Sequence, residues 1–258
     1  MLKEDIKFMP STVFEGMTSI RAVISAYDQG ISDRKIEKIF FDKAKLKKIS
    51  KEVGYFKAVS RKYGFELIES NQEYLEKITL GSSHGGIVAI TSDRTVPKLT
   101  SDFIKDHDGF YCMIDGIEDP YNFGYALRSL YACGVNGVIL PERNWLSSAG
   151  IVCRSSAGAS EMIRFATATC EETAEIFKSN SYKIVCADMD TDNILGTTSL
   201  PFPLLLIVGG EKRGISKKIL DLSDIKVRIH YAREFKAALS AASATTMFAY
   251  EIMRQNLK

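Results

Sequence analysis

The chain has 258 residues, of which 45% are hydrophobic, 26% charged and 10% aromatic. This composition excludes disorder, collagen-like fibres and small disulfide scaffolds, and it supplies enough apolar residues for one large core or two smaller ones. No apolar run reaches the roughly 20 residues of a membrane-spanning helix, and the first residues carry mixed charge. We therefore expect a cytoplasmic protein with no membrane partner.

Cysteine and histidine are sparse and scattered along the chain. The five cysteines show no C-x-x-C spacing, and the three histidines are His84, His107 and His230. We interpret the cysteines as reduced, buried thiols and expect no metal site. The small supply of histidine also disfavours a Ser-His-Asp hydrolase.

The formal net charge is only +2, but the charge is unevenly distributed. Residues 34–62 contain 11 lysines or arginines and three acidic residues. A helix with this charge can be an ordinary solvated surface, and it can also contact phosphate groups. The segment alone leaves both interpretations open.

In the first part of the chain, helical and strand patterns alternate. Apolar residues at helical spacing predict helices, and short apolar runs predict strands. The expected elements are helix 15–28, strand 36–41, basic helix 44–63, strand 65–68, helix 71–77 and strand 86–91. We therefore expect a small α/β domain over residues 1–95, followed by a polar linker to about residue 106.

The alternation resumes in residues 107–258, which we expect to form a second domain. The expected elements are strand 110–115, helix 122–133, strand 137–140, a Ser/Ala/Gly turn at 155–160, strand 163–166, helix 171–180, strands 183–187 and 204–208, helix 216–222, strand 225–229 and helix 235–256. Continuous apolar strands separated by helices predict a parallel sheet that is covered on both faces.

The loop after Val208 is a candidate ligand site, because open parallel sheets bind ligands at the carboxyl ends of their strands. It contains Gly209, Gly210, Glu211 and Gly214, which fit neither a phosphate loop nor the dinucleotide fingerprint. Its glycines are as typical of a tight strand-to-helix turn as of a site where a ligand approaches the backbone.

The loop after Asp115 is the second candidate, and it leads into a helix that carries Asn122 and Arg128. Asn122 is suited to cap this helix. Arg128 lies between Leu127 and Leu130, so we expect it to need an anionic partner, which a bound phosphate would supply.

These segments, taken in order, resemble the SpoU, or TrmH-like, family of RNA ribose 2′-O-methyltransferases in the SPOUT class. The family motif Asn-Pro-x-Asn-x-Gly-x-x-x-Arg is similar to residues 119–128, with Asp119 in place of the first Asn. A strand followed by Gly-x-Glu-x-x-Gly is similar to residues 206–214, and a Ser-Ala-Gly-Ala turn is matched at 156–159. The third motif, Ser-Leu-Asn before a helix of small residues, is matched only in part by residues 238–240. The likeness covers about residues 107–256.

The resemblance implies a C-terminal α/β domain with a deep trefoil knot, preceded by a small α/β RNA-binding domain. Residues 84–88 are similar to the segment that closes this domain in several relatives, which favours an RNA contact for the basic segment 34–62. The implied activity is methyl transfer from S-adenosyl-L-methionine to a ribose 2′-hydroxyl, by a homodimer acting on structured RNA. Ribosomal RNA of the 23S type is the favoured substrate, and transfer RNA is the alternative.

The resemblance also assigns site residues, motif by motif. The cofactor would contact mainly backbone groups at Gly209, Ile229 and Leu239. Arg128 would hold the target phosphate and promote loss of the hydroxyl proton to phosphate or water, because the pKa of arginine is too high for a general base.

On the acceptor side, Asn122 and Glu211 would shape the pocket for the ribose. Ser240 stands where the family has an asparagine that contributes to the site, and Ala238 stands where the family has a serine. These two differences favour a rival hypothesis, a non-catalytic RNA-binding protein with the same fold. A nucleotide-dependent oxidoreductase is disfavoured by the missing fingerprint. The target nucleotide, and a housekeeping or an antibiotic-resistance role, are not determined by the sequence.

Overall fold

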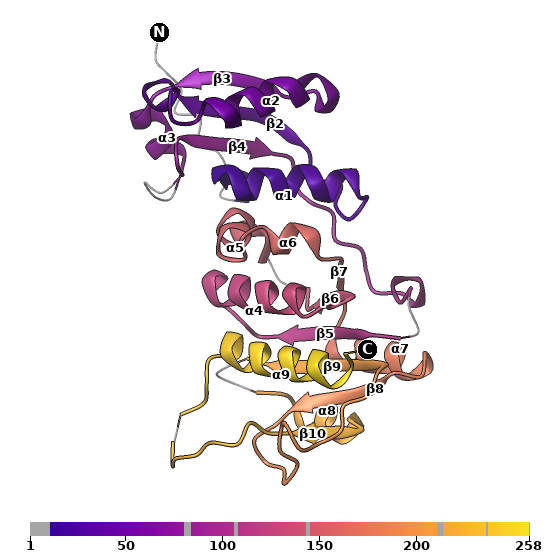
Figure 1. The fold of residues 1–258 in the computed structure, drawn as a ribbon. Helices are drawn as coiled ribbons and strands as arrows, with labels where there is room; N and C mark the ends of the chain where they lie inside the picture. The colour runs from indigo at the N-terminus through magenta and orange to yellow at the C-terminus, as the bar shows by residue number, and fades with distance from the viewer. Residues whose placement is uncertain are drawn as a thin grey trace. The chain divides into compact units, whose positions relative to one another are not determined.

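The structure, a computed structural model, describes residues 11–79, 84–105, 108–142, 145–210, 214–235 and 237–257. The chain divides into two compact units, whose elements are drawn in Figure 1. The first unit comprises Met1–Thr95 and Asn144–Met162, and the second comprises Val96–Arg143 and Ile163–Lys258. Within the described ranges, no helix has both the length and the apolar composition to cross a membrane.

The first unit is built on a four-stranded mixed sheet. Its strands are β1 (Val13–Glu15), β2 (Ile36–Asp42), β3 (Glu66–Ser70) and β4 (Ile87–Thr91). Its helices are α1 (Gly16–Asp28), η1 (Lys43–Lys45), α2 (Ser50–Tyr63), α3 (Gln72–Ile78), η3 (Trp145–Ser148), α5 (Ala149–Ser155) and α6 (Ala159–Met162). The strand order is β1-β4-β2-β3; β2 and β3 are parallel, and β4 is antiparallel to β1 and β2 (Figure 1).

Helices cover both faces of this sheet. Ile87 and Ala89 of β4 belong to a buried cluster with residues of α1, α2 and α5, whereas Val88 and Ile90 belong to a cluster with Leu75 of α3. Because successive side chains of a strand point to opposite faces, β4 contributes to two cores. The first unit is therefore a small α/β unit.

A buried ion pair joins residues 144–162 to the rest of the first unit. The Arg34 Nε donates to Glu161 Oε2 at 3.2 Å, and these side chains are 1% and 4% exposed. The Arg34 Nη1 also donates to Thr91 Oγ1 at 3.2 Å and to the Ser92 carbonyl at 2.7 Å. Arg34 is therefore a structural residue rather than a phosphate contact. The grouping of 144–162 with the first unit also differs from the predicted boundary, which assigned all of residues 107–258 to one domain.

The second unit is built on a six-stranded sheet. Its strands are β5 (Phe110–Asp115), β6 (Gly137–Leu140), β7 (Phe165–Thr167), β8 (Lys183–Ala187), β9 (Leu204–Gly209) and β10 (Ile225–Val227). Its helices are η2 (Ser101–Phe103), α4 (Pro120–Ala132), α7 (Cys170–Ser179), α8 (Lys217–Leu222) and α9 (Ala241–Gln255). The strand order is β10-β8-β9-β5-β6-β7, and all neighbours are parallel (Figure 1). The predicted parallel sheet is confirmed.

The central strands of this sheet are buried along almost their whole length. Residues 110–114 of β5 and 204–208 of β9 are at most 2% exposed. Phe177 of α7 and Ile219 of α8 share one buried cluster with Met113 of β5. Helices α4 and α9 lie side by side, joined by a 2.7 Å hydrogen bond from Thr246 Oγ1 to Ser129 Oγ, and α9 contacts β9 (Figure 1). The carboxyl ends of β8, β9 and β5 therefore open at one edge of a rigid sheet.

Several element boundaries differ from the predicted ones. The helix predicted for 44–63 begins at Ser50, because the Asp42 carboxylate accepts the Ala44 N–H at 3.0 Å and starts the short turn η1 instead. The helix predicted for 235–256 begins at Ala241, because Ser240 is its N-cap. Strand β1 is absent from the predicted elements, and its three residues form a strand by pairing with β4. The predicted turn at 155–160 contains the turn between α5 and α6.

Candidate functional site

A cavity of about 170 Å³ lies at the carboxyl ends of β8, β9 and β10 in the second unit. It is bounded by the segments that follow these three strands and by the start of α9. The lining residues are Ala187, Asp188, Met189, Val208, Gly209, Gly210, Gly214, Val227, Arg228, Ile229, Tyr231, Ala238, Leu239, Ala241, Ala244 and Phe248. Its position is the one that parallel α/β sheets generally use for ligands.

The three residues predicted to contact a cofactor, Gly209, Ile229 and Leu239, all line this cavity. They are up to 30 positions apart in the sequence. They come together because β9 and β10 end, and α9 begins, at the same edge of the unit. Sequence reasoning missed the wall formed by residues 187–189. Residue 187 is the last residue of strand 183–187 and residues 188–189 directly follow it, so the same rule for strand ends would have found them.

The glycines after β9 have a steric reason. A Cβ atom at Gly209 would lie 2.4 Å from the backbone carbon of Gly214, and one at Gly210 would lie 2.4 Å from the carbonyl oxygen of Gly116. Residues 210 and 214 also pair through a short antiparallel bridge, and Gly214 has a φ of +60°. The loops after β5 and β9 are therefore in backbone contact, and this contact leaves no room for a side chain.

Asn122 does not cap α4, so the predicted cap is wrong. The N-cap is Asp119, whose Oδ1 accepts the backbone N–H of Asn122 at 2.7 Å, and Pro120 occupies the first helical position. Proline fits that position because its missing N–H would have no partner there. The Asn122 side chain is half-buried at the start of the helix and takes no part in capping.

Arg128 lies on the exposed surface of α4, so the expectation that burial would demand an anionic partner is wrong. Arg128 shares one helical stripe with Tyr121 and Tyr125, which are 53% and 50% exposed. In the part of the chain that the structure describes, no carboxylate forms an ion pair with Arg128. The guanidinium is accessible to an external phosphate.

The start of α9 fixes the backbone of the third motif. Ser240 caps the helix by accepting the Ser243 N–H at 3.2 Å, and its hydroxyl donates to Ser243 Oγ at 3.0 Å. The backbone N–H of Leu239 donates to the Tyr231 hydroxyl at 3.1 Å, a contact that the sequence does not reveal. Neither Ser240 nor Asn122 nor Arg128 lines the cavity. Glu211 lies outside the described residues.

Two thiols near this edge of the sheet are inert. Burial raises the pKa of Cys186, at the end of β8, to about 12. Burial, assisted by the nearby Asp115 carboxylate, raises the pKa of Cys170 to about 12. Both thiols are therefore protonated at neutral pH and cannot act as nucleophiles. All five cysteines are free thiols; Cys112, Cys153 and Cys186 are buried, as predicted, whereas Cys133 and Cys170 are only partly buried. Among the described residues, no group of three or more His, Cys, Asp or Glu side chains is arranged to hold a metal ion.

The basic segment of the first unit is only partly available to a ligand. Lys43 pairs with Glu69 at 2.7 Å, and Lys45 lies 3.9 Å from the buried Asp42 carboxylate. Lys47, Lys48 and Lys51 are exposed. His84, at the nearby turn before β4, is 1% exposed, and burial, with a further contribution from Lys45, lowers its pKa. Positive charge at this end of the unit therefore comes from lysine.

Comparisons with known proteins agree on one family. The sequence profile of the SpoU rRNA Methylase family matches residues 109–250. The chain is 25% identical to YacO of Bacillus subtilis, a protein assigned to the TrmH family of tRNA/rRNA methyltransferases, over 87% of this chain and 90% of YacO. It is 28% identical to the 23S rRNA (guanosine-2′-O-)-methyltransferase RlmB of Blochmanniella floridana, over 76% of this chain and 79% of RlmB. Its match to a TrmH-family relative from Staphylococcus haemolyticus, 29% identical, covers 58% of this chain and 61% of that protein.

Solved structures share the fold over nearly the whole chain. An RNA 2′-O ribose methyltransferase superposes with a TM-score of 0.77 and 22% identity, covering 94% of this chain and 88% of that one. An AdoMet-bound rRNA methyltransferase from Sinorhizobium meliloti superposes with a TM-score of 0.74 and 21% identity, covering 96% and 88%. The profile match covers more than half of the sequence. It includes β9, the glycine loop that follows it, β10 and the start of α9. The chain belongs to the SpoU rRNA Methylase family.

Proposed function

We propose that this protein transfers a methyl group from S-adenosyl-L-methionine to a ribose 2′-hydroxyl of structured RNA in the cytoplasm. Ribosomal RNA is the favoured substrate and transfer RNA the alternative. The observation that carries the proposal is the meeting of Gly209, Ile229 and Leu239 at one cavity, at the ligand-binding edge of a SpoU-family sheet. The 2′-O-ribose target is supported by two similar proteins, RlmB and the solved 2′-O ribose methyltransferase.

The residues around the cavity fit the proposed cofactor. Close backbone packing at Gly209 and Gly210 excludes side chains, so the cavity is bounded there by main-chain groups that can hydrogen-bond a nucleoside. Leu239 and Phe248 supply apolar wall for a purine ring. A carboxylate residue, Asp188, also lines the cavity, and it suits the positive charges of the sulfonium and ammonium groups.

When bound, S-adenosyl-L-methionine supplies an activated methyl group. The chain itself has to hold the acceptor ribose in line with that group, because orientation is the main requirement of a direct displacement. We assign Arg128, on the open face of α4, to the phosphate next to the target ribose, and Asn122 and Glu211 to the acceptor pocket. The hydroxyl proton leaves to phosphate or water, since arginine remains protonated.

We propose that the protein acts as a homodimer through the surface of α4 and α9. Tyr121 and Tyr125 on α4 and Met247 and Tyr250 on α9 are 44–56% exposed. Neighbouring exposed aromatic and methionine side chains on paired helices are typical of a protein interface. A second copy covering this surface would place Arg128 at the interface. Sedimentation should then report about twice the 28.7 kDa chain mass. We also propose that residues 107–258 contain the deep trefoil knot that the resemblance to the SPOUT class implies.

A methyl-transfer assay tests the activity directly. RNA from a strain that lacks the gene is incubated with the protein and tritium-labelled S-adenosyl-L-methionine, and ribose-methylated positions are mapped by their resistance to alkaline hydrolysis. We expect label at one or a few sites, each on a 2′-oxygen. Label on a base would refute the 2′-hydroxyl target. In a separate melting experiment, S-adenosyl-L-methionine should raise the melting temperature of the protein and NAD should not.

One observation favours a second function, RNA binding without catalysis. The Ser240 hydroxyl is committed to the cap of α9, so it is a poor substitute for the asparagine that contributes to the site in the family. In that case the protein would bind RNA but transfer no methyl group to any cellular RNA. The same assay therefore separates the two functions.

A further inference from the structure

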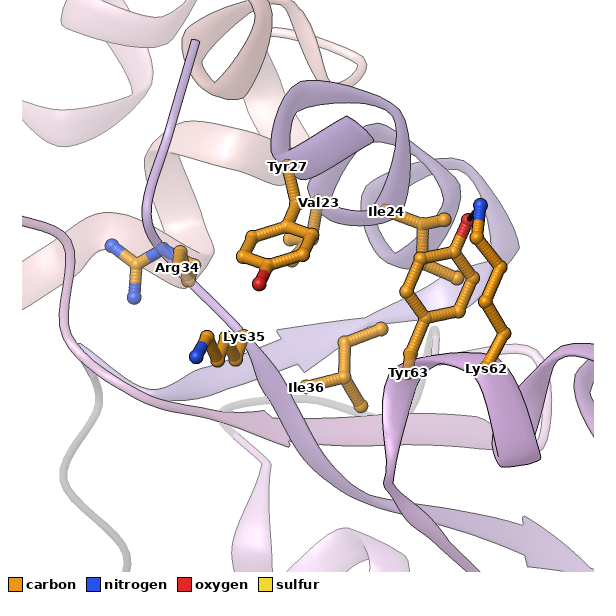
Figure 2. A pocket seen from close by; sticks show the side chains of 8 residues that line it. All are labelled: Val23, Ile24, Tyr27, Arg34, Lys35, Ile36, Lys62 and Tyr63. Carbon is orange, nitrogen blue, oxygen red and sulfur yellow. Dashed lines mark hydrogen bonds between the residues drawn. The ribbon is translucent and has the colours of Figure 1, made fainter. Parts of the chain in front are cut away.

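A hollow of about 110 Å³ in the first unit combines aromatic, apolar and cationic side chains (Figure 2). It lies between the last two turns of α1, the first residues of β2 and the end of α2. Val23, Ile24 and Ile36 form its apolar floor, and each is at most 6% exposed. Because the side chains of the floor offer no hydrogen-bond partners to water, the floor favours contact with a flat apolar surface of a ligand.

Two tyrosine rings form the walls of the hollow. In Figure 2, Tyr27 and Tyr63 stand on either side of it, with Ile36 between them. Tyr27 is 39% exposed, so part of its ring can be approached from solvent. The Tyr63 hydroxyl accepts a hydrogen bond from Lys62 Nζ at 2.7 Å and donates one to Asp28. These bonds hold the Tyr63 ring in place, which makes this wall preformed.

Positive charge lies at the rim of the hollow rather than at its floor. Lys35 Nζ lies over one face of the Tyr27 ring, 5.7 Å from its centre, and Lys62 Nζ lies over one face of the Tyr63 ring, 4.5 Å from its centre. The Lys62 ammonium is shared with Asp28 at 3.1 Å, so Lys35 is the cation more available to a ligand. The guanidinium of Arg34 points away from the hollow (Figure 2), and its Nε forms the ion pair with Glu161. No acidic side chain lines the hollow among the described residues.

We propose that this hollow binds one unstacked nucleobase of the substrate RNA, with Lys35 and Lys62 beside the adjoining phosphates. A planar ring between aromatic walls with anions at its edge matches a nucleotide, and base–aromatic stacking is the usual way in which proteins hold single-stranded RNA. A base inside a duplex is already paired and stacked, so only a loop, bulge or single-stranded base can enter. The proposal rests on the proposed function, which supplies the RNA substrate.

The test compares two probes on the whole protein, fluorescein-labelled octauridylate and an octamer of abasic ribose units with the same phosphates. Tyr27→Leu keeps apolar cover over the floor but removes the stacking face. It should weaken octauridylate binding about 5- to 150-fold, the scale of one lost base–aromatic stack, and leave the abasic octamer unchanged. Tyr27→Phe should bind both probes as the wild type does, because it retains the ring.

Tyr55→Leu is the matched control, since Tyr55 is a half-buried tyrosine of the same unit that does not line the hollow. It should change neither affinity. A crosslinking arm keeps the test independent of whether Tyr27→Leu folds: irradiated 5-iodouridine octamer should attach to wild-type Tyr27 or Tyr63. Equal binding of the two probes by the wild type, no binding of octauridylate, or crosslinks only elsewhere would overturn the proposal.

The methylation assay distinguishes a failure of this proposal from a failure of the proposed function. A protein that crosslinks the 5-iodouridine octamer at Tyr27 or Tyr63 but methylates no RNA retains the nucleobase site and loses the enzymatic function. A protein that methylates RNA, and whose Tyr27→Leu variant binds both probes as the wild type does, retains the function and loses the nucleobase site.

Discussion

Replacing Gly210 by alanine tests whether backbone contact between two loops forms the candidate cofactor site. The added Cβ would lie 2.4 Å from the carbonyl oxygen of Gly116 and 2.8 Å from its carbonyl carbon. Contacts under 3.0 Å are essentially never adopted by a real Cβ, so the loop after β5 or the loop after β9 must move by more than half an ångström. Both loops continue buried parallel strands, so this movement strains the sheet edge.

Overpacking of this kind typically costs about 1–3 kcal/mol, which we expect as the loss in unfolding free energy for Gly210→Ala. Because Gly210 also lines the cavity, S-adenosylhomocysteine affinity should fall at least tenfold. The measurements are urea denaturation and isothermal titration calorimetry. Gly54→Ala is the control: it lies in α2 with no atom within 4 Å of the added Cβ, so it should stabilise the protein by about 0.5–1 kcal/mol and leave affinity unchanged. Wild-type stability and affinity in Gly210→Ala would refute the argument.

Three further outcomes are expected. Arg128→Ala should lower the single-turnover methylation rate about 10²- to 10³-fold with little change in cofactor affinity, and Arg128→Lys should recover little, because lysine lacks the planar fork that fixes a phosphate; an unchanged rate would exclude Arg128 from the reaction. If S-adenosylhomocysteine accepts a hydrogen bond from the Leu239 N–H, Tyr231→Phe should strengthen its binding about 2- to 10-fold in calorimetry, because the N–H then has no hydrogen bond to the Tyr231 hydroxyl to break. Weaker binding would mean that Tyr231 supports the cavity. Hydrogen bonding to Arg254 lowers the pKa of Glu251 from 4.5 to about 2, so its contribution to stability is present above about pH 4.5 and is lost as the pH falls toward 2; Glu251→Gln should remove this part of the acid dependence of urea denaturation, and an unchanged dependence would contradict the assignment.

The strands were the most predictable part of this fold, for a physical reason. Strands 110–115, 137–140 and 183–187 have the predicted limits because each is built around a continuous apolar run whose residues are buried. Helix ends were less predictable, because they depend on which of several polar residues becomes the cap. Residues 237–239 favour a helix by composition, yet the helix begins after Ser240. Short elements that exist only through tertiary contacts, such as β1 and α6, leave no periodic signal.

The candidate site was predictable where the backbone forms it and not where side chains do. Gly209, Ile229 and Leu239 gather at one cavity because strand ends in a parallel sheet share an edge, which is a topological rule. The exposure of Arg128 was not predictable from its neighbours. Leu127 and Leu130 suggest a buried stretch, and both are buried, but residue 128 lies on another side of the same helix and is exposed. Tyr231 was missed because its hydrogen bond to Leu239 spans a turn that the sequence pattern does not describe.

The two positions that differ from asparagines of the family motifs both fall at helix caps, which explains why the fold accepts them. Asp119 replaces an asparagine and caps α4, and Ser240 replaces an asparagine and caps α9. Aspartate, serine and asparagine cap helices about equally well, so these changes preserve the backbone while removing an amide. Ser240→Asn should therefore leave the unfolding free energy within about 0.5 kcal/mol of the wild type while restoring the amide.

If the amide supports the reaction, Ser240→Asn should raise the single-turnover methylation rate without altering cofactor affinity, because residue 240 does not line the cavity. Ser240→Ala is the control: it removes the cap and should cost about 1 kcal/mol of stability with no gain in rate. A stable Ser240→Asn variant with the wild-type rate would show that this chain has no use for the amide. If neither the wild type nor Ser240→Asn transfers a methyl group, the hypothesis of RNA binding without catalysis is favoured instead. The restored amide would then have failed to produce activity in a protein whose helix cap is intact.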